Sequence, residues 1–123
     1  MRTVVAVIGA SNDRRKFGNR AVRGYVAEGY TVIPIHPHAQ EIEGLKAYPS
    51  VADVPGPIDV ASLYVPPGIG LQLIDEIARK QIPEVWFNPG SESEALIDRA
   101  RQLSVRSIVA CSLLAIGQNP HAL

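Results

Sequence analysis

Short apolar runs rich in Val and Ile recur along this chain and constrain its fold more than any other feature. Five such runs occupy residues 3–8, 30–35, 59–65, 84–87 and 107–111, and none alternates cleanly with polar residues. Strands buried on both faces of a parallel sheet have this composition. The sequence therefore predicts five strands in one parallel sheet.

Segments with a helical period separate most of these runs. Apolar residues recur every three or four positions within residues 21–26, 71–78 and 96–103, which is typical of helices that lay one face on a sheet. Gly29 suits a helix C-terminus, and Ser91 with Glu94 has the spacing of a capping box that opens the third helix. Residues 37–57, rich in Pro and Gly, replace the helix expected between the second and third strands, with one short helical turn near residues 50–54.

The alternation of strands and helices predicts an α/β fold: a Rossmann-like, doubly wound, five-stranded parallel sheet in the order 3-2-1-4-5. With 123 residues the chain has the size of one domain, so we expect a single domain over residues 1–123. Basic and acidic residues both number 12, so the overall charge favours neither nucleic acid nor an anionic membrane as a partner. The chain has one cysteine, no signal-like start and no apolar run long enough to span a bilayer. We therefore expect a cytoplasmic protein.

The loop after the first strand is the predicted binding site, because ligands of such sheets lie beyond the carboxyl ends of the strands. Gly9 allows a tight turn close to a ligand, while Ser11 and the free amides of the following helix can donate to phosphate oxygens. Five of the 12 basic residues fall within residues 14–23, which contain no acid. Cations at a helix N-terminus oppose the helix dipole, so we expect Arg14, Arg15 and Lys16 to bind an anion and interpret Arg20 and Arg23 as solvated surface residues.

The residues do not by themselves choose between two cofactors. A dinucleotide site would have Gly-x-Gly-x-x-Gly after the first strand and an acid after the second. Here Ser11 stands at the second glycine position, and the second strand runs into His36 and Pro37. Coenzyme A (CoA) and NADP both carry an extra ribose phosphate that the basic loop could meet, so both remain open at this point.

Seven short motifs occur in a characteristic order over nearly the whole chain. They are Gly-Ala-Ser at 9–11, Lys-Phe-Gly at 16–18, Ile-Pro-Ile-His-Pro at 33–37, Ile-Glu-Gly at 42–44, Tyr-Pro-Ser-Val at 48–51, Ile-Asp at 58–59 and Val-Pro at 65–66. In these motifs the chain resembles the small CoA-binding proteins, whose domain is similar to the N-terminal domain of the succinyl-CoA synthetase α-subunit and of ADP-forming acyl-CoA synthetases. The resemblance implies a Rossmann-like fold that holds coenzyme A.

The resemblance also implies which residues contact CoA. It assigns the phosphates to Gly9, Ala10, Ser11, Lys16, Phe17 and Gly18, and further contacts to His36, Pro37, Val65, Pro66, Pro67, Asn88, Pro89 and Gly90. Two positions depart from the family pattern: His36 stands where Asn is common, and Asn88 stands where Gln is often seen.

No constellation of residues predicts catalysis. His36 and His38 lack a third metal ligand at a suitable spacing, and Cys111, in an apolar run, is typical of small buried packing. The phosphorylated histidine of the related ligases lies in a further domain, which has no counterpart in this sequence. We therefore expect a module that binds CoA or an acyl-CoA without catalysis of its own; the alternatives are an NADP-type oxidoreductase and a CoA-ligase subunit that needs a partner chain.

Overall fold

The computed structural model describes residues 2–123 and contains one five-stranded parallel sheet. Its strands are β1 (Val4–Ile8), β2 (Thr31–Ile35), β5 (Val60–Leu63), β6 (Glu84–Phe87) and β7 (Arg106–Val109), in the spatial order β2-β1-β5-β6-β7. All four neighbouring pairs are parallel. The predicted doubly wound α/β fold is confirmed, and all five predicted strands are present.

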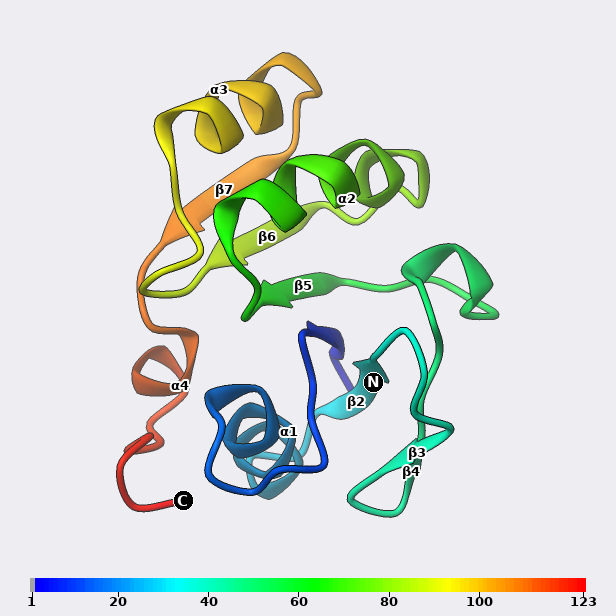
Figure 1. The fold of residues 1–123 in the computed structure, drawn as a ribbon, viewed down its shortest axis with the longest axis vertical. Helices are drawn as coiled ribbons and strands as arrows, with labels where there is room; N and C mark the ends of the chain where they lie inside the picture. Colours follow the sequence, from blue (N-terminus) through cyan, green and yellow to red (C-terminus); the bar gives the residue numbers. More distant parts are fainter. Residues whose placement is uncertain (1) are drawn as a thin grey trace.

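Helices cover both faces of the sheet (Figure 1). The helices α2 (Pro67–Arg79) and α3 (Glu94–Gln102) pack on one face, while α1 (Phe17–Ala27) and the short α4 (Ser112–Ala115) lie on the other. Alternate residues of β1 serve the two layers, since Ala6 and Ile8 face the first and Val5 and Val7 the second. Successive side chains of a strand point to opposite faces of the sheet. Because both faces of β1 are buried, all of its residues must be apolar.

The connection between β2 and β5 occupies the outer edge of β2. It contains a hairpin of β3 (Glu41–Ile42) and β4 (Leu45–Lys46), followed by the 3-10 turn η1 (Val51–Asp53). Tyr48 forms a single parallel bridge with Ile35 of β2. The bridge lies at the outer edge of β2, which is where the third strand of a 3-2-1-4-5 sheet would pair. The ladder does not continue beyond Tyr48, because the chain turns into η1 at Val51, and the run that we counted third, β5, pairs with β1.

The helix ends follow from local sequence, with one correction. Gly29 has a φ of +85° directly after the end of α1, as predicted, and Pro67 is the first residue of α2. The predicted capping box of Ser91 and Glu94 is wrong. Ser93 caps α3 instead, and its Oγ accepts a hydrogen bond from the Leu96 N–H at 3.1 Å. Helix α4 was not predicted; Cys111, which we placed at the end of the last strand, is its N-cap.

Candidate functional site

The switch point of the sheet lies between β1 and β5, because α1 follows β1 on one face and α2 follows β5 on the other. Parallel sheets bind ligands at this point, beyond the carboxyl ends of the strands. A cavity of about 620 Å³ occupies it. We call this the phosphate cavity; its lining comprises Gly9, Ala10, Ser11, Lys16, Phe17, Gly18, His36, Pro37, Tyr64, Val65, Pro66, Pro89, Gly90 and Ser91.

Two glycines let the loop after β1 reach this point. A Cβ on Gly9, whose φ is +92°, would lie 2.7 Å from the Tyr64 carbonyl oxygen, and a Cβ on Gly18 would lie 1.9 Å from the Gly9 carbonyl oxygen. Both positions exclude any side chain, since real Cβ atoms do not approach backbone oxygens so closely. The glycines thus bring strand, loop and helix N-terminus into direct contact around the cavity.

The start of α1 presents hydrogen-bond donors to the cavity. Among residues 2–123, the N–H groups of Phe17 and Gly18 have no acceptor, as is normal in the first turn of a helix without a side-chain cap. Ser11 accepts a hydrogen bond at Oγ from the Asp13 N–H at 3.0 Å, which leaves its hydroxyl proton free to donate. This arrangement can bind a phosphate.

The structure separates the basic residues that the sequence grouped together. Arg15 forms a two-pronged ion pair with Asp13 at 3.0 and 3.1 Å, and Arg14 lies 3.5 Å from Glu43 of the hairpin. The hydrogen bonds from Arg15 lower the pKa of Asp13 to about 2. Neither arginine lines the phosphate cavity, whereas Lys16 does, and no ion pair engages Lys16 within the described residues.

Arg20 and Arg23, interpreted from the sequence as solvated, instead make contacts within the protein. Arg20 donates to the Pro120 carbonyl at 3.1 Å and lies over the Phe17 ring. Arg23 donates to Oδ1 of Asn19 at 2.7 Å, and Asn19 in turn donates to the Ser11 carbonyl at 2.9 Å. Asn19 is fully buried and fixes the loop, a role that the sequence did not reveal.

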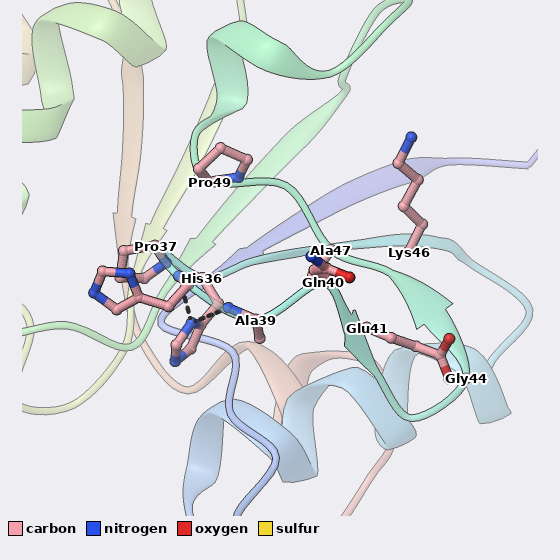
Figure 2. Close-up of a pocket in the computed structure, with 10 residues that line it drawn as sticks. His36, Pro37, Ala39, Gln40, Glu41, Gly44, Lys46, Ala47 and Pro49 are labelled. Carbon is pink, nitrogen blue, oxygen red and sulfur yellow. Dashed lines mark hydrogen bonds between the residues drawn. The ribbon is translucent and has the colours of Figure 1, made fainter.

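His36, at the end of β2, stabilises the turn that follows the strand in the same way as an Asn side chain would. Its Nδ1 accepts hydrogen bonds from the N–H groups of His38 at 3.0 Å and Ala39 at 2.9 Å, which Figure 2 shows as dashed lines. An Asn side-chain oxygen can accept in the same way. The departure from the family pattern therefore preserves the loop, and in the neutral ring the proton is on Nε2, where it can donate to a ligand.

Asn88, predicted as a cofactor contact, has its whole amide engaged inside the protein. Its Nδ2 donates to Ser62 Oγ and the Leu63 carbonyl, both at 2.9 Å, while its Oδ1 accepts from the Ser112 N–H and hydroxyl, also at 2.9 Å. The Tyr64 hydroxyl lies 3.0 Å from Ser112 Oγ, and burial raises the pKa of Tyr64 to about 12. Asn88 therefore positions the β6 loop rather than lining the phosphate cavity.

Twelve of the sixteen predicted site residues line the phosphate cavity; Arg14, Arg15, Pro67 and Asn88 do not. Sequence reasoning missed Tyr64 and Ser91. Tyr64 directly follows β5 and could have been found as a strand-end residue. Ser91 was interpreted as a helix cap, but it is buried and donates to the Leu63 carbonyl at 3.2 Å.

Within residues 2–123, no group of three potential metal ligands gathers, and no helix is long and apolar enough to cross a membrane.

Comparison with known proteins identifies the family. The family described as the CoA binding domain matches residues 3–117. The α-subunit of acetate–CoA ligase (ADP-forming) II from Pyrococcus furiosus is 37% identical over 82 residues, which are 66% of this chain and 18% of that subunit. The uncharacterized Bacillus subtilis protein YneT is 27% identical over 94 residues, which are 73% of this chain and 67% of that protein.

Solved structures agree with this relationship. A conserved hypothetical protein from Pyrococcus furiosus superposes with a TM-score of 0.86 at 34% identity, covering 94% of this chain and 99% of that one. A dinucleotide-forming acetyl-coenzyme A synthetase from Ca. Korarchaeum cryptofilum, solved with phosphate and ADP, gives a TM-score of 0.79 at 34% identity, covering 88% of this chain and 25% of that one. The chain belongs to the CoA-binding domain family, and it spans less than a fifth of the length of the P. furiosus ligase subunit.

Proposed function

We propose that this chain binds coenzyme A or an acyl-CoA in the phosphate cavity. The observation that carries the proposal is the convergence, at the switch point of the sheet, of the unpaired amides of Phe17 and Gly18, the free Ser11 hydroxyl proton and Lys16. These groups match an anionic diphosphate, and membership of the CoA-binding family favours CoA among the nucleotides with this feature.

The surroundings suit the adenine end of the ligand as well. An apolar cavity of about 280 Å³ between β1, β2 and α2 shares Gly9, Pro37 and Val65 with the phosphate cavity. Its walls include Ile69 and Leu73, and Ser50 and Glu76 also line it, where they can meet the polar edge of a base. We call it the β2-side cavity and assign the adenine to it.

A second function is supported by the relatives themselves. Several of them are ADP-forming CoA ligases, so a CoA-ligase subunit that acts with a partner chain is an alternative to a stand-alone, non-catalytic binding module. An NADP-type oxidoreductase has less support, because His36 stands where a ribose-binding acid would be expected. In every case we propose action in the cytoplasm.

Ligand discrimination tests the proposal. Native mass spectrometry of freshly purified protein should show a co-purifying CoA-sized mass, and CoA should raise the melting temperature more than NAD or NADP at equal concentration. In calorimetric titration, 3'-phospho-ADP should compete with CoA, dephospho-CoA should bind more weakly, and pantetheine alone should compete poorly. A shift with NADP equal to that with CoA would overturn the assignment.

A further inference from the structure

A third cavity lies on the opposite side of the phosphate cavity from the β2-side cavity. It has a volume of about 270 Å³ and is enclosed by the first turn of α1, the ends of β5 and β6, helix α4 and the C-terminal segment. We call it the tail cavity; its walls include Phe17, Tyr64, Cys111, Leu113, Leu114 and Pro120.

The tail cavity adjoins the phosphate cavity. Phe17, Tyr64 and Pro89 line both. A ligand whose phosphates lie at the start of α1 can therefore place its adenine on the β2 side and its other end in the tail cavity, without crossing the body of the protein.

The chemistry of the walls favours an apolar occupant. No Asp, Glu, Lys or Arg among residues 2–123 lines the cavity. The polar side chains of Tyr64 and Asn88 line it, but Ser112, Ser62 and the β5 backbone already satisfy them. His121 is the remaining polar ring in the lining, and its edge-on contact is with Phe17. A charged group placed here would lose its hydration and could meet only the His121 ring, whereas an alkyl chain loses nothing.

The C-terminal segment forms one wall and is held in place by specific contacts. Arg20 donates to the Pro120 carbonyl at 3.1 Å, the His121 ring meets the Phe17 ring edge-on at 6.1 Å, and Gln118 donates to Glu28 at 2.7 Å. The cavity is thus a built part of the fold, with its outer wall tied to α1.

We propose that the tail cavity receives the acyl chain of an acyl-CoA, so that the protein selects acylated over free CoA. This inference rests on the proposed CoA binding in the phosphate cavity. A water-sized atom takes up about 30 Å³, so the cavity has room for the thioester group and a chain of about four to six carbons. The expected ligand class is therefore a short-chain acyl-CoA.

Titration calorimetry with CoA and with acetyl-, butyryl-, hexanoyl- and dodecanoyl-CoA tests this directly. Affinity should rise by roughly two- to fourfold for each added methylene as far as hexanoyl-CoA and then level off or fall. Equal affinities for CoA, butyryl-CoA and hexanoyl-CoA would overturn the acyl site while leaving CoA binding intact. Failure of all five to bind would instead overturn the proposed function.

A charge placed on the cavity wall gives a second test. Leu114 is 62% exposed, so Leu114→Asp should fold normally, yet it puts a carboxylate beside the acyl chain. We expect the ratio of hexanoyl-CoA to CoA affinity to fall to about one. Leu71→Asp, at a 40% exposed residue of α2 outside every cavity described here, is the matched control and should keep the wild-type ratio. The same loss in both variants would contradict the site.

Cys111 provides a readout that does not depend on affinity. It is the only cysteine of the chain and it lines the tail cavity, so iodoacetamide modification reports occupancy there. Saturating hexanoyl-CoA should slow the alkylation at least several-fold, whereas saturating 3'-phospho-ADP, which lacks the pantetheine arm and the acyl chain, should not. Equal protection by both ligands would mean that the acyl chain does not enter the cavity.

Discussion

Two loops beside the phosphate cavity use their polar groups in opposite ways. The first loop, which comprises the segment after β1 and the start of α1 (residues 9–18), leaves the Phe17 and Gly18 amides, the Ser11 hydroxyl proton and the Lys16 side chain without protein partners. The loop after β6, residues 88–91, engages the side chains of Asn88 and Ser91 in buried hydrogen bonds. The first loop offers groups to a ligand, and the second holds the wall in shape.

The difference indicates what each loop contributes to the energy of the protein. Unsatisfied donors at a helix N-terminus that lines an open cavity can be hydrated, so leaving them free costs little and keeps them available. A buried amide such as that of Asn88 must be fully paired, because an unpaired buried polar group is expensive. Substitutions in the first loop should therefore affect ligand affinity, except at its glycines, and those in the second should affect stability.

The largest effect is expected at Gly18. This glycine belongs to the first loop, but its close packing means that a substitution there should affect stability as well as ligand affinity. Gly18→Ala would set a methyl group 1.9 Å from the Gly9 carbonyl oxygen, forcing strand and helix apart. We expect a loss of about 3 kcal/mol or more in unfolding free energy, together with loss of CoA binding. Gly68→Ala in α2, where nothing lies within 4 Å, is the control and should be neutral or slightly stabilising in urea unfolding.

Removing the amide of the second loop tests its structural role. Asn88→Ala leaves the Ser112 N–H without a partner and the Leu63 carbonyl with Ser91 as its one side-chain donor, and should lower the unfolding free energy by about 2 to 3 kcal/mol. Asn12→Ala, which removes a single exposed hydrogen bond to the Glu41 carbonyl, should cost less than about 0.5 kcal/mol. Comparable losses in the two variants would contradict a buried network at Asn88.

Within the first loop, Lys16 and Arg15 should behave differently although they are neighbours. Lys16→Ala should weaken CoA binding by about 1 to 3 kcal/mol without changing stability, because a charge-assisted contact to phosphate is lost. Arg15→Ala should change affinity by less than about twofold, because that side chain is exposed and already paired with Asp13. Calorimetric titration of both variants decides the matter, and a larger effect at Arg15 would refute the assignment of the phosphates to Lys16.

The smallest effect concerns the Tyr64 hydroxyl, which joins the network of the second loop. Its pKa is raised by burial from 10 to about 12, so the folded protein keeps this proton at a pH where the unfolded chain loses it. This contribution is complete below pH 10 and is lost as the pH rises towards 12, and we expect the part lost by pH 11.5 to amount to about 1 to 2 kcal/mol. Urea unfolding from pH 9 to 11.5 should show a shallower decline for Tyr64→Phe than for the wild type; parallel declines would exclude Tyr64 as the cause.

Local sequence determined the fold class and the position of the candidate site. The five apolar runs became strands because a parallel sheet buries both faces, and the alternation of strands with helices permits few topologies. Once the topology is known, strand ends and glycines indicate where a ligand binds. For this reason most of the predicted residues, from Gly9 to Gly90, line a single cavity.

Only the tertiary structure decided which polar groups are free. Arg14 and Glu43 are far apart in sequence, as are Asn88 and Ser112, and pairing between distant residues leaves no periodic signal. The same is true of the bridge at Tyr48, of the pairing of β5 with β1, and of the C-terminal segment that closes the tail cavity. Sequence patterns report burial and backbone preference, whereas the choice of partners depends on which segments the completed fold brings within hydrogen-bond distance.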